Sequence, residues 1–386
     1  MQRINWRHFD FWLLGSVILL IIFGVVMIRS AIAGNIELLD LNLVQRQLIF
    51  AILGLVVVFL VTWIDYHTWA AVNRTLYVAV AAALAVLYVV GSALYGSARW
   101  FDIGFILIQP SEIAKIVVIL ALGNFFARNQ HRIHQPAWIV RSFLLTMGIA
   151  IWILLQPDLS TSIVLFVIWF ALLWVSGLPV RYVLITGGAG LAVLLVTIPL
   201  VFNIILNPDA LGEDGLIKPY QVQRVRNFLF TDESARYGEA YNVEQALTTI
   251  GSGGLFGQGY GQNPQVQNRF LKVRQTDFIY AVMAGEFGFV GTSLVTAVLL
   301  FVIWRCLVVA RKARDTYGAL IAIGVATLLA FHAMVNVGMN LKLLPVTGLP
   351  LPFISYGGSS LLSMMLGIGL VESVAVRQKQ LEFEKI

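Results

Sequence analysis

One acidic side chain lies where a polar segment meets a long apolar one. Asp277 follows the cationic residues Arg269, Lys272 and Arg274 and precedes the apolar run. A carboxylate at the boundary between water and hydrocarbon is costly to keep charged, so it usually has a partner or a task. We expect Asp277 in the first turn of the following helix, where the helix dipole favours negative charge. It is then either a simple helix cap or a general base beside an anion-binding patch.

A second pair of ionisable residues opens another apolar segment. Glu112 and Lys115 are three residues apart, which places them on one face of a helix that begins at Pro110. One interpretation is a structural ion pair, because charged residues within membrane spans usually have partners. The other interpretation is functional: Lys115 meets a phosphate, and Glu112 holds the ammonium group in place.

Polar segments between apolar runs contain three more candidates. Asp158 occupies a helix-start position, where capping alone is a sufficient explanation. Arg99 is a candidate phosphate contact. Its neighbour Trp100 is either an aromatic residue at the membrane interface or a platform for a sugar ring.

The spacing of the remaining polar residues limits the possible chemistry. Glu286 lies about 13 Å from Asp277 along an ideal helix and on the opposite face, which is too far for a paired-carboxylate glycosidase site. His332 and Asn336 share a helix face, and lone polar residues of this kind usually hydrogen-bond between helices. The chain has no HExxH, CxxC or GxSxG motif, so no cofactor is identified and a divalent cation has no supporting ligand motif.

The elements that position these residues must be membrane spans. The chain has 386 residues, of which 59% are hydrophobic and 12% are charged. Charged residues make up roughly a quarter of an ordinary soluble domain. This composition therefore excludes an ordinary soluble protein. The net charge of +6 fits cytoplasmic loops and acidic lipid headgroups rather than nucleic acid.

The apolar segments predict an all-α polytopic membrane protein with about ten transmembrane helices. Residues 1–386 form a single integral membrane domain, with one large loop at 206–276 and a C-terminal tail at 377–386. That loop contains two candidate amphipathic segments, 220–230 and 239–250. The expected spans are 11–31, 47–64, 75–91, 111–127, 138–155, 159–176, 182–205, 277–304, 316–340 and 355–376.

The distribution of lysine and arginine places both termini in the cytoplasm. Loop 206–276 is then extracytoplasmic, together with 92–110, 341–354 and the turn at Asp158. Proline and glycine are frequent at 344–360, which predicts a re-entrant segment lining a wet cavity on the outer face. The glycine-rich stretch 251–262 lacks the spacing of a nucleotide-binding loop, so we interpret it as a compact turn with close backbone packing.

Four motifs resemble those of the SEDS family of shape, elongation, division and sporulation proteins. They are QPSEIAK (109–115), QPDLST (156–161), RQTDFIYAVMAGEFGFVG (274–291) and LPVTGLPLPFISYGGSS (344–360). The short N-terminus and the wording RWFDIGFILIQPSE are more similar to the elongation members than to the division members. Two departures are that LKVRQTDFIY replaces the common LPERHTDFIF, and that GEFG lacks a second glutamate.

The resemblance implies a peptidoglycan glycosyltransferase that polymerises lipid II outside the bacterial cytoplasmic membrane. It places the family's essential aspartate at Asp277, its polar cluster at Glu112 and Lys115, and the aspartate of its QPD turn at Asp158. In the last motif, Ser355 and Ser359 are further candidates for substrate binding.

The expected mechanism uses Asp277 to take a proton from the 4-hydroxyl of an acceptor lipid II sugar. That oxygen attacks the anomeric carbon of the growing strand, and undecaprenyl pyrophosphate leaves. The available cations are Lys115, Arg99 and Arg274.

Two other function classes remain open. A bundle with broken helices and buried polar residues could be a lipid II flippase. The chain could also be a non-catalytic scaffold for a class B penicillin-binding protein. The resemblance implies this transpeptidase as a partner, alongside the elongation machinery and membrane lipids.

Overall fold

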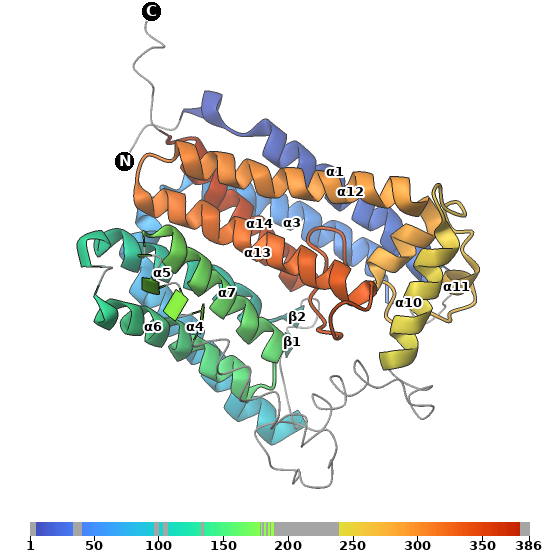
Figure 1. Ribbon diagram of the computed structural model, residues 1–386, viewed down its shortest axis with the longest axis horizontal. Helices are drawn as coiled ribbons and strands as arrows, with labels where there is room; N and C mark the ends of the chain where they lie inside the picture. The colour runs from blue at the N-terminus through green and yellow to red at the C-terminus, as the bar shows by residue number, and fades with distance from the viewer. Residues whose placement is uncertain are drawn as a thin grey trace, which may run out of the picture.

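The computed structural model describes residues 5–33, 41–95, 100–102, 107–132, 135–177, 179, 181, 182, 184, 185, 187, 188 and 239–378. Nearly all ordered elements in this part are helices (Figure 1). The long ones are α1 (Phe11–Ile32), α3 (Leu43–Trp63), α4 (Tyr66–Tyr95), α5 (Pro110–Arg128), α6 (Pro136–Leu155), α7 (Leu159–Val175), α12 (Ile279–Lys312), α13 (Thr316–Asn340) and α14 (Gly358–Ala375).

The shorter elements lie at the ends of the long helices. They are η1 (Trp6–His8), η2 (Gln130–Arg132), α10 (Glu239–Gly253), α11 (Pro264–Gln267) and the two strands β1 (Phe101–Asp102) and β2 (Leu107–Ile108). The strands pair antiparallel, with Phe101 opposite Ile108. Helix α10 confirms the expected segment 239–250, whereas 220–230 lies outside the described residues.

Eight described helices are long and apolar enough to cross a membrane, namely α1, α3, α4, α5, α6, α12, α13 and α14. Helix α7 is equally apolar but shorter, with 17 residues. These helices confirm the expected all-α polytopic fold. The expected span at 182–205 lies largely outside the described residues.

Helices α5 and α14 form the centre of the bundle. In each, 78% of the apolar window is buried, against 44% or less for α1, α3, α4, α6 and α12. Small residues allow the close packing around α14. A Cβ atom added to Gly369 would lie 3.1 Å from the carbonyl oxygen of Val58 on α3. The two central helices also carry the predicted polar residues 109–115 and 355–360 at their N-terminal ends.

The bundle has two distinct ends. At the termini end, the Asn5 backbone N–H donates to the Val376 carbonyl at 3.2 Å. Helix α14 begins at the opposite end, which we call the loop end because it contains loop 341–357 (Figure 1). Residues 268–278, which precede α12, also lie at the loop end, because Arg274 contacts the C-terminal turn of α1 there.

Helix α12 is broken at Gly288, where φ is 66° and ψ is −169°. The expected span at 277–304 is confirmed by Ile279–Lys312, which contains this break. A break leaves backbone N–H groups without helical partners. Carbonyl groups of the glycine-rich stretch 251–262 accept hydrogen bonds from them. Phe289 N–H donates to Gly254 O at 2.9 Å, and Val290 N–H donates to Leu255 O at 3.0 Å.

The same contacts explain why this stretch is rich in glycine. Gly257 has φ +81°, and a Cβ atom there would lie 2.1 Å from the carbonyl oxygen of Glu286. Only glycine allows this backbone conformation and this approach. The expected compact turn over 251–262 is confirmed from residue 254 onward, whereas residues 251–253 end α10. The turn pairs with the exposed backbone of the broken helix.

Candidate active site

A polar cavity of about 270 Å³ opens at the loop end. Its walls come from the residues before α5, from α5 itself, from the start of α7, from the segment before α12, and from the loop before α14. The lining residues are Trp100, Gln109, Glu112, Asp158, Ser160, Thr161, Thr276, Asp277, Thr347, Gly348, Leu349, Pro350, Tyr356, Gly357 and Ser360.

The cavity brings together four of the residues singled out in the sequence. Glu112, Asp158 and Asp277 are separated along the chain, yet all three line this one space, and Trp100 lies at its edge with 47% of its surface exposed. An exposed aromatic ring beside carboxylates suits a sugar, which offers both an apolar face and hydroxyl groups. Arg99 lies outside the described residues.

Asp277 lies just before α12 and not within it. The helix begins at Ile279, Phe278 occupies the N-cap position, and the first turn contains no acidic residue. The expectation that Asp277 sits in the first turn is therefore wrong. Its carboxylate faces loop 341–357, because a Cβ atom added to Gly348 would lie 4.0 Å from Asp277 Oδ2. Glycine at this position, where φ is +77°, leaves room beside the carboxylate.

Glu112 and Lys115 form the expected ion pair. Lys115 Nζ lies 2.7 Å from Glu112 Oε1 and 3.2 Å from His332 Nε2. Only 1% of the Lys115 surface is exposed, and this residue does not line the cavity, whereas Glu112 does. The structural interpretation is confirmed. A direct phosphate contact by Lys115 stays a prediction, and its ammonium group lies behind Glu112.

Asp158 caps α7, as its position in the sequence suggested. Its carboxylate accepts hydrogen bonds from Thr161 N–H at 3.1 Å and from Thr161 Oγ1–H at 2.9 Å. It also lines the cavity, so it contributes negative charge there. The positive end of the α7 dipole partly offsets this charge.

Arg274 is not brought to the cavity. Its guanidinium donates to the carbonyl of Ala31 at the end of α1 and, at 3.3 Å, to that of Leu271. The last carbonyls of a helix lack helical partners and attract cations, which accounts for this placement. Burial lowers the pKa of Arg274, and neighbouring Arg269 lowers it further. Arg274 therefore joins α1 to the segment before α12.

Ser355 and Ser359 hold the cavity walls together and do not line the cavity. Ser355 Oγ–H donates to Thr276 O at 2.8 Å, and Ser359 Oγ accepts from Gln109 N–H at 3.2 Å. Their neighbours Tyr356 and Ser360 face the cavity instead. The motif was identified correctly, but residues 355–357 lie in a loop without a regular period, and the orientation of α14 decides that Ser360 rather than Ser359 faces the cavity.

Two residues absent from the sequence-based candidates lie at the cavity edge. The phenol of Tyr356 is hydrogen-bonded to the side chain of Arg46, which lies in the first turns of α3. This contact places a guanidinium group beside the cavity. The only signal in the sequence was the position of Arg46 in a short loop-end segment that is otherwise poor in cations.

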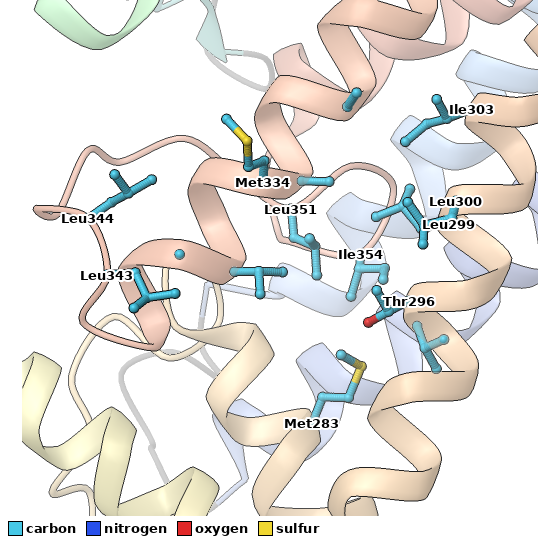
Figure 2. Close-up of a pocket in the computed structure, with 15 residues that line it drawn as sticks. Met283, Thr296, Leu299, Leu300, Ile303, Met334, Leu343, Leu344, Leu351 and Ile354 are labelled. Atoms are coloured by element: carbon cyan, nitrogen blue, oxygen red, sulfur yellow. The ribbon is translucent and has the colours of Figure 1, made fainter. Parts of the chain in front are cut away.

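A second cavity, of about 460 Å³, lies between α12 and α13. In Figure 2, Leu351 and Ile354 reach it from loop 341–357 and face Leu299 and Leu300. None of its lining residues is charged, and Thr296 supplies the only side-chain hydroxyl among them. A sugar or a pyrophosphate group needs polar partners, and the lining of this second cavity offers almost none. Loop 341–357 separates the two spaces.

The described residues contain no group of three His, Cys, Asp or Glu side chains placed to hold a metal ion.

Comparison with known proteins identifies the family to which this chain belongs. A family described as "Cell cycle protein", which comprises FtsW, RodA and SpoVE, matches residues 11–380. The chain belongs to this family, the SEDS family. Stage V sporulation protein E of Bacillus subtilis is 32% identical over 95% of this chain and 96% of its own length. Peptidoglycan glycosyltransferase MrdB of Escherichia coli K12 is 34% identical over 97% and 95%.

Solved structures of similar proteins share this fold. The crystal structure of the rod shape determining protein RodA from Thermus thermophilus has a TM-score of 0.67 and 29% identity, and covers 96% of this chain and 98% of its own. A chain of a peptidoglycan synthase complex that coordinates polymerization and crosslinking has a TM-score of 0.76 and 30% identity, and covers 96% and 99%.

The branch of the SEDS family stays a prediction. A probable peptidoglycan glycosyltransferase FtsW from Aliivibrio salmonicida is 31% identical over 94% of this chain and 88% of its own length. This identity is close to those of the sporulation protein and of MrdB. The preference for the elongation members therefore still rests on the wording of the sequence.

Proposed function

We propose that this SEDS protein is a peptidoglycan glycosyltransferase that polymerises lipid II, with Asp277 as its general base. The observation that carries the proposal is the placement of the Asp277 carboxylate in a polar cavity at the loop end. Relatives named peptidoglycan glycosyltransferases, similar over nearly their full length, support the activity.

In the proposed reaction, Asp277 accepts the proton of the 4-hydroxyl of an acceptor lipid II sugar. The oxygen forms a bond to the anomeric carbon of the growing strand, and the bond from that carbon to the pyrophosphate oxygen breaks. Undecaprenyl pyrophosphate leaves with the bonding electrons. A well-placed general base contributes about 10²–10⁴-fold to the rate.

The leaving pyrophosphate needs positive charge nearby, and the cavity lining is acidic. Lys115 neutralises Glu112, and the α7 N-terminus offsets the charge of Asp158. Both effects reduce the repulsion of a phosphate group. Arg46, which is bonded to Tyr356, then supplies a cation at the cavity edge. We assign Arg46 and Arg99 as candidate pyrophosphate contacts and Lys115 as an indirect one.

The loop end is proposed to face outward from the bacterial cytoplasmic membrane. Cytoplasmic segments carry an excess of lysine and arginine. The cations that cluster at the termini end are Arg128 in the last turn of α5, Arg305, Arg311 and Lys312 in the last turns of α12, and Arg377 after α14. This distribution supports the proposal that both termini are cytoplasmic and that the cavity opens on the side where lipid II is polymerised.

The proposed partner is a class B penicillin-binding protein, which would cross-link the strands. The support is the similarity to a chain of a synthase complex that couples polymerization to crosslinking. Elongation proteins and membrane lipids are the further partners that the sequence implies.

The test is purified protein in proteoliposomes supplied with lipid II, with and without the transpeptidase. Our proposal predicts glycan strands on gels. A flippase would instead move fluorescent lipid II across the bilayer without forming strands. A scaffold would do neither alone and would only raise the activity of its partner.

A further inference from the structure

We propose that His332, Asn336 and Asn340 on α13 are positioning residues for glycosyl transfer. This inference rests on the proposed role of Asp277. The three residues are fully buried, with 0% of their surfaces exposed. They recur at every fourth position and therefore lie along one face of the helix. We call this face the polar ridge of α13.

The ridge holds the backbone of the proposed base. Asn336 Nδ2 donates to the carbonyl oxygen of Asp277 at 3.2 Å, and Asn340 Nδ2 donates to the same oxygen at 3.0 Å. A carbonyl oxygen has two lone pairs, so these two donors satisfy it fully. The position of the Asp277 peptide is thus fixed by a different helix.

Asn340 also supports the first turn of α12. Its Oδ1 accepts from Ala281 N–H at 3.2 Å. The first N–H groups of a helix have no partners within the helix and are normally served by a cap from the same chain segment. Ala281 N–H also donates to Phe278 O at 3.1 Å, so Asn340 on α13 is a second acceptor that ties the start of α12 to α13.

Asn336 connects the base to the opposite wall. The same Nδ2 atom donates to Leu349 O at 2.9 Å. An amide nitrogen has two hydrogens, which suffice for Asp277 and Leu349. Because Leu349 and Asp277 both line the cavity, one side chain sets their separation.

His332 extends the ridge to the ion pair. Its Nδ1 lies 3.3 Å from Pro350 O, and its Nε2 lies 3.2 Å from Lys115 Nζ. A carbonyl oxygen only accepts, so Nδ1 carries the proton and Nε2 accepts from the ammonium group. The imidazole is therefore neutral. It joins the Glu112–Lys115 pair to the loop that forms the cavity wall.

The ridge thus defines the distance between Asp277 and both other walls. Misplacing a reacting group by about 1 Å can cost about 100-fold in rate. Removing a ridge donor should therefore lower kcat strongly and change substrate binding little, because the ridge residues do not line the cavity.

The experiment compares Asn336→Leu and His332→Leu with two matched variants in reconstituted full-length protein. Asn→Leu keeps the approximate volume and removes the donors. His332→Gln retains an amide N–H for Pro350 and a carbonyl oxygen for Lys115, so it should restore activity relative to His332→Leu. Thr327→Val is the control, since the Thr327 hydroxyl donates to Ile323 O within α13.

We expect Asn336→Leu and His332→Leu to lower kcat about 10–100-fold, with the lipid II KM within about threefold of the parent. His332→Gln should recover most of the loss, and Thr327→Val should be unchanged. Rates are compared at equal folded fraction, measured by thermal unfolding in detergent. A lower melting temperature with unchanged kcat, or a KM effect without a kcat effect, would overturn the proposal.

Asp277→Asn is measured in parallel to separate the two proposals. If that variant is inactive and the ridge variants are fully active, only the positioning role fails. If Asp277→Asn polymerises normally, the proposed base itself fails.

Discussion

The side chain of Asn336 donates a hydrogen bond to the backbone carbonyl of Asp277 at 3.2 Å. Asn336 lies on α13, Asp277 lies in the segment before α12, and the same amide also donates to the loop before α14. The proposed base is therefore placed by tertiary contacts and not by the helix that follows it. The site depends on several buried polar side chains that never touch the substrate.

Lys115 should be more important for folding than for direct substrate contact. Lys115→Met leaves the Glu112 carboxylate buried without its cation, and breaking such a pair costs about 3–5 kcal/mol. We expect a lower free energy of unfolding in denaturant titrations in detergent. The double variant Glu112→Gln, Lys115→Met should recover much of this stability. Equal stability of Lys115→Met and the parent would contradict the structural pairing.

Asp158 offers a test of capping against chemistry. Asp158→Ala removes the α7 cap and should cost about 1 kcal/mol of stability, whereas Asp158→Asn keeps an oxygen acceptor and should cost less. Thermal unfolding measures the order of stability of the parent and the two variants. At equal folded fraction, Asp158→Asn should polymerise lipid II within about threefold of the parent, since we assign the proton transfer to Asp277. A loss of about 100-fold or more would instead assign Asp158 a chemical role.

Arg46 should contribute to substrate binding through its charge. A hydrogen bond to a charged group is worth about 1.5–3 kcal/mol, so Arg46→Met should raise the KM for lipid II about tenfold or more. Arg46→Lys keeps the charge, so its KM for lipid II should lie between that of the parent and that of Arg46→Met. Tyr356→Phe is the companion variant, because it removes the hydroxyl that holds Arg46 and leaves the cation in place. If the KM for lipid II is the same in all three variants as in the parent, Arg46 does not contribute to substrate binding.

The sequence was sufficient for the membrane fold and for the identity of the main cavity residues. Apolar segments of spanning length are recognised by composition, and Glu112, Asp158 and Asp277 are acidic residues at the starts of such segments. The alternation of spans assigned all three residues to the same end of the bundle, which predicted that they lie near one another. These inferences depend only on local patterns and on the alternation of spans.

What failed depended on contacts between distant segments. The break at Gly288 is stabilised by residues 254 and 255, and Arg274 is held by the end of α1. The N-cap position of α12 is occupied by Phe278, and Asn340 of α13 accepts from Ala281 N–H, so helix-start statistics misplaced Asp277. Ser355 and Ser359 were chosen by motif alone, and only the three-dimensional path of the loop and of the first turn of α14 shows that Tyr356 and Ser360 face the cavity.

The most direct test is the polymerisation rate of Asp277→Asn in reconstituted protein supplied with lipid II. Asparagine keeps the shape of the side chain but accepts no proton. Asp315→Asn is the control, because Asp315 lies at the other end of the bundle, where it caps α13 and contacts Tyr66 and His67. Asparagine still caps the helix and still has an oxygen acceptor. At equal folded fraction, we predict a loss of at least about 100-fold for Asp277→Asn and a near-parental rate for Asp315→Asn. Strand synthesis by Asp277→Asn at the parental rate would contradict the role of Asp277 as general base.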